Sequence, residues 1–127
     1  MPIHDIETAP YVSLATFRRS GVQVATPVWC APADGAHYVF SAGDAGKVKR
    51  LRNSPRARLA VCDVRGALRG DWHEARGELL EAREDIDAAL RALHAKYGWR
   101  MRLTDLLSKL TGKHDRRAYI RLTPASR

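Results

Sequence analysis

The chain has 127 residues and carries 22 lysines and arginines against 14 aspartates and glutamates, which gives a formal net charge of +8. This length predicts a single domain over residues 1–127, and a hydrophobic content of 45% excludes a disordered basic tail. The positive charge favours anionic partners. No segment approaches the roughly 20 apolar residues of a membrane span, so we expect a cytoplasmic protein with no membrane partner.

The first third of the chain has the pattern of β-strands. Residues 11–17 alternate with period two, a polar turn follows, and residues 22–29 resume an extended run, which predicts a hairpin. Asp34-Gly35 predicts a second tight turn, after which a strand over residues 37–41 is expected to pair back on the preceding strand.

A short helix interrupts this strand pattern. We expect it over residues 47–53, ending at Ser54-Pro55 because proline disfavours the helical conformation in the residue before it. Two further strands are expected over residues 56–64 and 72–80, where apolar and polar positions alternate.

The second half supplies helices and one last strand. Residues 84–97 carry apolar side chains at helical spacing, and we expect that face to pack on the sheet. A second stripe is formed by Leu103, Leu106, Leu107 and Leu110, with Gly112 placed as a stop. Residues 118–123 predict a closing strand. The element order therefore predicts a mainly β fold, an antiparallel barrel with appended helices.

The segment from residue 41 to residue 52 is the strongest candidate for a binding site. A strand delivers the hydroxyl of Ser41, glycines follow, and a helix then begins with the cations Lys47, Lys49 and Arg50. Lys47 and Arg50 are three residues apart and share a helical face, so both can reach one phosphate or carboxylate, whereas Lys49 points elsewhere. The alternative is a solvated basic turn with Asp44 as the helix cap.

Two familiar nucleotide sites are excluded by spacing. A P-loop requires Gly where Ser41 stands and Ser or Thr where Val48 stands, and no GxGxxG sequence occurs. The five histidines have no metal-ligand spacing, so we assign no metal. Cys30 and Cys62 lack CxxC spacing and are expected to be reduced packing residues.

Pro27 lies within a predicted strand although it cannot donate a ladder hydrogen bond. Either Pro27 marks a sheet edge or bulge, or the backbone there faces a bound planar ring that uses the amide of Val28. Trp29 is expected in the core. The basic stretch over residues 109–117 favours a solvated loop over a nucleic-acid site, because no aromatic residues alternate with its charges.

Five segments, in this order, resemble one known family, and the resemblance covers nearly the whole chain. They are Tyr11 to Gly21, Val24 to Trp29 with Thr-Pro-Val-Trp, Tyr38 to Ser41, Gly46 to Arg56 with Gly-Lys-Val-Lys-Arg-Leu, and Ala118 to Pro124. The chain is similar to the pyridoxamine 5'-phosphate oxidase-like split barrels, and within them to the small flavin- and deazaflavin-dependent oxidoreductases.

This resemblance implies a six-stranded, FMN-binding-like split β-barrel. It implies a homodimer that holds FMN or the deazaflavin coenzyme F-420 at the subunit interface, with the choice between the two cofactors open. Lys47, with Ser41 and either Lys49 or Arg50, would hold the cofactor phosphate. The backbone of three consecutive residues would lie along the ring, namely Thr26, Pro27 and Val28.

The function expected from the resemblance is transfer of a hydride between this cofactor and a small organic substrate, with no catalytic residue assigned. Many relatives carry an aromatic or amide residue in the loop where this chain has Asp44, an unfavourable neighbour for a phosphate. A noncatalytic module that binds a flavin-like or haem-like ligand is the alternative, because one fold serves several functions. Nucleic-acid binding is a third, less favoured hypothesis.

Overall fold

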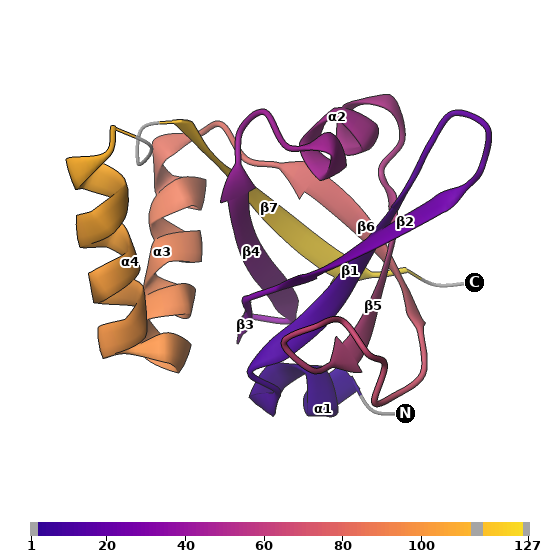
Figure 1. The fold of residues 1–127 in the computed structure, drawn as a ribbon, viewed down its shortest axis with the longest axis horizontal. Coiled ribbons are helices and arrows are strands. Elements are labelled where there is room, and N and C mark those ends of the chain that lie inside the picture. The colour runs from indigo at the N-terminus through magenta and orange to yellow at the C-terminus, as the bar shows by residue number, and fades with distance from the viewer. Residues whose placement is uncertain (1–2, 113–115, 126–127) are drawn as a thin grey trace.

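The computed structural model describes residues 3–112 and 116–125. Seven strands form one antiparallel sheet in the order β2-β1-β5-β6-β7-β4-β3. The strands are β1 (Tyr11–Phe17), β2 (Gln23–Val28), β3 (Cys30–Ala33), β4 (Ala36–Ala42), β5 (Arg56–Cys62), β6 (His73–Leu79) and β7 (Arg117–Pro124). The helices are α1 (Ile3–Thr8), α2 (Gly46–Asn53), α3 (Arg83–Tyr97) and α4 (Trp99–Leu110). Figure 1 shows the sheet curling into an incompletely closed barrel with α3 and α4 on one side.

The predicted split barrel with appended helices is confirmed, with seven strands in place of six. The difference lies at Trp29, which interrupts the predicted strand 22–29, so that β2 pairs with β1 while β3 pairs with β4. Asp34 and Gly35 both have positive φ, 51° and 80°. This tight turn pairs Ala33 with Ala36, so β4 pairs with β3, the strand immediately before the turn.

One hydrophobic cluster fills the barrel interior. Val12 and Leu14 of β1 meet Leu59 of β5 and Ile120 of β7, and all four are essentially inaccessible to solvent. α1, a helix that was not expected from the sequence, closes one end of the barrel with the buried side chain of Ile6. α2 lies at the opposite end (Figure 1).

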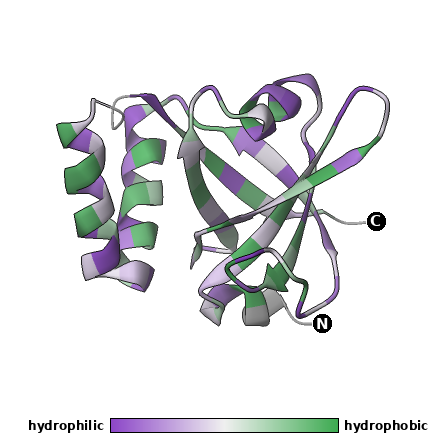
Figure 2. Cartoon of the chain, viewed as in Figure 1, coloured by the Kyte–Doolittle hydropathy of each residue, from purple (hydrophilic) through white to green (hydrophobic). Residues whose placement is uncertain are grey.

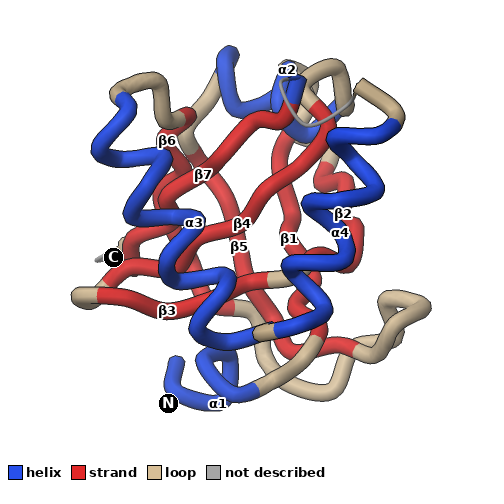
Figure 3. Tube along the Cα trace, turned by 90° about the vertical axis from the view of Figure 1, so that its left-hand side faces the viewer, coloured by secondary structure: helices blue, strands red, loops and turns tan. Residues whose placement is uncertain are grey.

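A second cluster joins α3 to the outer face of β3, β4 and β7. Trp29, which was expected in the core, is partly buried and packs against this cluster, stacked on Tyr97 with ring centroids 4.6 Å apart. α4 packs on α3 as the outermost element, and in Figure 3 the two helices stand side by side in front of the sheet. The predicted leucine stripe of α4 therefore faces outward, whereas the buried side of the helix is represented by Met101.

Pro27 lies on β2, which is an edge strand because it pairs only with β1. This position confirms the sheet-edge interpretation of Pro27. Both cysteines are free and buried. Within residues 3–112 and 116–125, no helix has the length and apolar content that a membrane crossing requires.

Candidate functional site

The turn between β4 and α2 sets the position of the candidate cations. Ala45 is the N-cap residue of α2, and its extended backbone carries no capping side chain. Asp44 was the alternative cap and does not perform that role; its side chain is exposed. The first amides of α2 therefore have no side-chain acceptor, and the N-terminal end of the helix keeps its positive partial charge.

Lys47 and Arg50 lie one turn apart on α2, while the buried Val48 and Leu51 anchor the helix to the barrel. Burial lowers the pKa of Lys47 from its ordinary value of 10.5, and the charge of Arg50 lowers it further. Among the described residues Lys47 has no hydrogen-bond or ion-pair partner that would offset this loss of solvation. Lys49 is exposed and lies on a different face of the helix.

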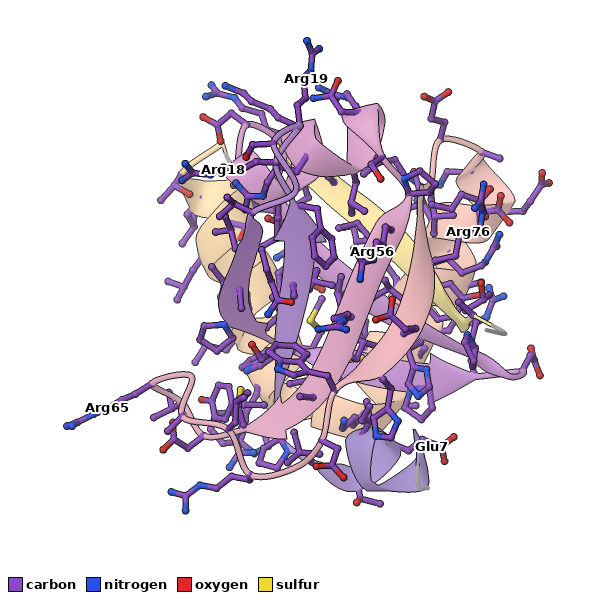
Figure 4. All side chains as sticks on the ribbon, turned by 90° about the vertical axis from the view of Figure 1, so that its right-hand side faces the viewer. Glu7, Arg18, Arg19, Arg56, Arg65 and Arg76 are labelled. Carbon is purple, nitrogen blue, oxygen red and sulfur yellow. The ribbon has the colours of Figure 1, made fainter. Side chains whose placement is uncertain are left out.

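Arg50 connects α2 to the strands. Its Nε donates a hydrogen bond of 2.6 Å to Thr16 Oγ1 of β1. Its guanidinium also covers the start of the helix, because a Cβ at Gly46 would lie 2.7 Å from Nη1. Burial is the main cause that lowers the pKa of Arg50, and Arg18 of the β1–β2 hairpin contributes repulsion. Figure 4 shows Arg18 close to the hairpin end of the barrel, beside α2.

Thr26 supplies an unsatisfied polar atom on β2, the strand that pairs with the Thr16 side of β1. In the antiparallel register Thr16 faces Val24, and Thr26 follows two residues later on the same face of β2. Thr26 Oγ1 is buried and has no hydrogen-bond partner among the described residues. A buried hydroxyl without a partner costs about 1 to 3 kcal/mol, which makes it a natural contact for a polar ligand group.

Ser41 and Asp44 line a pocket of about 550 Å³ between the β4–α2 turn, the start of β7 and α4. Ser41 Oγ donates only to the adjacent Ala42 carbonyl oxygen, at 3.3 Å. We expected glycines here to admit a ligand, but Gly43 serves packing: its amide donates to Arg116 O at 2.7 Å, and a Cβ would lie 2.3 Å from that oxygen.

The three predicted ring-contact residues lie together on the edge strand. Pro27 is exposed, Thr26 is half-buried and Val28 is buried at the strand end. The loop between β5 and β6 approaches this edge, because a Cβ at Gly66 would lie 3.6 Å from Pro27 Cδ. The structure thus places Lys47 and Arg50 together on α2 and Ser41 at the pocket beside the β4–α2 turn, while Lys49 is turned to solvent. Pro27 and Val28 lie at the other end of β2, which pairs with the start of β1 and adjoins the β5–β6 loop.

Arg117 was expected in a solvated basic loop, and this expectation is wrong. Its side chain is 4% exposed and donates to Asp105 Oδ1 at 2.7 Å and to Ser108 Oγ at 3.0 Å. The guanidinium also lies 4.5 Å above the Phe40 ring. Sequence analysis missed this cluster because its partners come from β4 and α4, and the charge run alone carries no information about them. Residues 113–115 of the same basic stretch lie outside the described residues.

Three solved structures illustrate the likeness of the fold. The conserved hypothetical protein Rv2991 of Mycobacterium tuberculosis superposes with a TM-score of 0.71 at 20% identity, covering 99% of this chain and 82% of that one. The haem storage protein HutZ of Vibrio cholerae gives 0.70 at 15% identity, covering 93% and 83%. An FAD-binding protein of Mesorhizobium loti gives 0.60 at 17% identity, covering 95% and 83%.

These likenesses establish the fold and leave the function open, since the matched proteins include one described as storing haem and one described as binding FAD. No curated protein matches the chain. The sequence model of the family described as "Pyridoxamine 5'-phosphate oxidase" matches residues 4–126, which is almost the entire length. The chain therefore belongs to the pyridoxamine 5'-phosphate oxidase family.

Proposed function

We infer that this protein is an oxidoreductase that binds a flavin-type cofactor, FMN or coenzyme F-420, and uses it on a small organic substrate. The observation that carries this proposal is Lys47, a half-buried cation with no anionic partner among the described residues. A phosphate bound beside Lys47 and Arg50 would supply the missing negative charge.

The residues present fit such a cofactor in two respects. Lys47, Arg50 and the uncapped start of α2 form a cationic site suited to a phosphate. Thr26 Oγ1 is a buried hydroxyl in need of a partner on the strand expected to lie along the ring. Asp44, the unfavourable neighbour, is exposed at the pocket and does not cap the helix.

The bound cofactor would supply hydride transfer, which leaves binding and orientation to the protein. In this proposal Lys47 and Arg50 hold the phosphate, with Ser41 as a further hydrogen-bond donor. The backbone of β2 from Thr26 to Val28 orients the ring. Pro27 is exposed on the strand edge, where a second subunit of a homodimer would cover it and exclude water.

The first experiment is a fluorescence titration of the purified protein with FMN and, separately, with coenzyme F-420. Lys47→Ala is expected to weaken binding of the preferred cofactor by about 1 to 3 kcal/mol, because it removes a charge-assisted contact. Lys49→Ala is the matched control: it removes the same charge from the same helix on its exposed face, and its affinity should stay within about twofold of the parent.

Equal losses in Lys47→Ala and Lys49→Ala would show that only the general positive field matters, and unchanged affinity in both would place the site elsewhere. Cofactor preference then selects the substrates: tight binding of F-420 calls for turnover assays with reduced F-420 and unsaturated or quinone-like acceptors. Preference for FMN calls for oxidase and reductase assays.

A second function, a noncatalytic ligand-binding protein, is favoured by the likeness to the haem storage protein HutZ. A titration with haemin followed by its absorbance distinguishes the two proposals. Binding of haemin in place of FMN and F-420, with no turnover of any electron acceptor, would support the binding protein and contradict the oxidoreductase.

A further inference from the structure

The outermost helix of the molecule, α4, exposes a continuous apolar stripe. Five large side chains recur at helical spacing along its outer face and are between 48% and 74% exposed: Trp99, Leu103, Leu106, Leu107 and Leu110. The helix packs on α3 by its other face, where Met101 is fully buried. Figure 2 shows green apolar bands on α4 at the edge of the molecule, away from the barrel.

Cations border this stripe, and the single acidic residue of the helix is turned away from it. Arg100, Arg102 and Lys109 are exposed. Arg100 also places its guanidinium 5.6 Å from the centre of the Trp99 ring. Asp105 is only 15% exposed; on the inner side it forms an ion pair with Arg117, and its Oδ2 lies 2.8 Å from His94 Nε2. The outer surface of α4 is therefore apolar along its centre and positive along its borders.

A second copy of the chain is a poor occupant for this surface. A helix of 12 residues is about 18 Å long and about 10 Å wide, so pairing two such faces buries far less than the 1,200 to 2,000 Å² of a specific interface. Pairing would also bring the cationic borders of the two copies together. An anionic lipid surface instead accepts leucine and tryptophan side chains between its headgroups and attracts the arginines and lysine.

We propose that α4 binds peripherally to anionic lipid bilayers, inserting its leucine stripe at the headgroup boundary while its bordering cations contact acidic headgroups. The proposal concerns binding in the plane of the surface, which is compatible with the lack of a spanning helix among the described residues. It sets aside the expectation of no membrane partner, which rested on spanning segments alone. It is also independent of the cofactor proposal, because α2 and β2 contribute nothing to this surface.

The test is flotation of the full chain with vesicles of phosphatidylcholine, alone or mixed with phosphatidylglycerol. The protein should float with the mixed vesicles, and added salt should release part of it. Leu106→Ser/Leu110→Ser should lower partitioning at least about tenfold, because two partly inserted leucines are lost. Arg102→Ala/Lys109→Ala should lower binding to mixed vesicles about fivefold for each cation removed.

The matched control is Val22→Ser/Leu68→Ser, which removes two other exposed apolar side chains and should float like the parent. Circular dichroism checks that each variant is folded, and titration with FMN or F-420 should give the same result for the parent and the α4 variants. Failure of the parent to float, or equal flotation of Leu106→Ser/Leu110→Ser, would overturn the proposal. A parent that sediments as a dimer and becomes a monomer in this variant would assign the stripe to a second copy.

Discussion

Two cationic regions of this protein differ in what surrounds the charge. Arg117 is almost completely buried, yet Asp105, Ser108 and the Phe40 ring satisfy its guanidinium. Lys47 is only half-buried, yet no anion among the described residues faces it. Burial of a cation therefore does not by itself indicate a ligand site, because Arg117 has its partners within the fold. The missing partner distinguishes Lys47 and makes it the better candidate for binding an anion.

The largest change in the free energy of unfolding is expected when the buried guanidinium of Arg117 loses its carboxylate partner. Asp105→Ala removes the carboxylate from Arg117 and should lower the free energy of unfolding by about 3 to 5 kcal/mol, the cost of an unpaired buried charge. Urea denaturation measures this change. The control is Asp85→Asn, which breaks the more exposed Arg121–Asp85 pair and should cost at most about 1 kcal/mol. Equal losses of stability in both variants would contradict the expected difference between the buried and the more exposed ion pair.

The opposite result is expected at Lys47. In the absence of ligand, Lys47→Met should leave the free energy of unfolding unchanged or raise it by up to about 1 kcal/mol, because it removes a desolvated charge and keeps the apolar stem. The same urea denaturation measures it. A destabilisation comparable with that of Asp105→Ala would show that Lys47 has a structural partner and would weaken its assignment as an anion site.

His37 extends the comparison to a buried group that can lose its charge. It is 2% exposed, and neither ring nitrogen has a hydrogen-bond partner among the described residues. Burial lowers its pKa from 6.5; the negative charge of Glu7 opposes this shift, and the positive charge of Lys96 adds to it. The folded protein thus binds fewer protons here than the unfolded chain does, so stability should decrease as the pH falls below about 6.5.

Urea midpoints at pH 7.5 and pH 5 test this prediction. His37→Leu should lose part of the pH dependence, because the variant has no imidazole to protonate. An identical pH dependence in the parent and the variant would show that other groups cause it.

The smallest effect is expected for the buried thiols. Burial raises the pKa of Cys30 to about 12 and raises that of Cys62 as well. Neither is a thiolate at neutral pH, so a disulfide reagent at pH 8 should label the folded protein very slowly and the urea-unfolded chain at once. Rapid labelling of the native state would show that one of the two thiols becomes exposed by local opening.

Local signals were sufficient for much of the fold. The Asp34-Gly35 turn and the helix before Ser54-Pro55 were predicted because a few adjacent residues determine them. The interruption at Trp29 was missed, since residues 22–29 form one extended run in the sequence. Only the pairing of β3 with β4 shows that the chain passes at Trp29 from one edge of the sheet to the other. The stripe of α4 was predicted without its direction, because periodicity identifies an apolar face but not its partner.

The candidate site was predictable in the same uneven way. The shared face of Lys47 and Arg50 followed from helical spacing alone. The contact of Arg50 with Thr16 of β1, and the unsatisfied hydroxyl of Thr26 on β2, depend on strands far away in the sequence. For the same reason Gly43 was expected to leave space for a ligand, whereas in the structure it packs against the carbonyl oxygen of Arg116.

The two edge strands of the sheet, β2 and β3, are consecutive in the chain and are joined by a single residue, Trp29. Two peptide units span at most about 7 Å, so the edges cannot separate at that point. Trp29 is itself held by stacking on Tyr97. Any separation of the two edge strands must therefore start away from Trp29, because this residue ties the end of β2 to the beginning of β3.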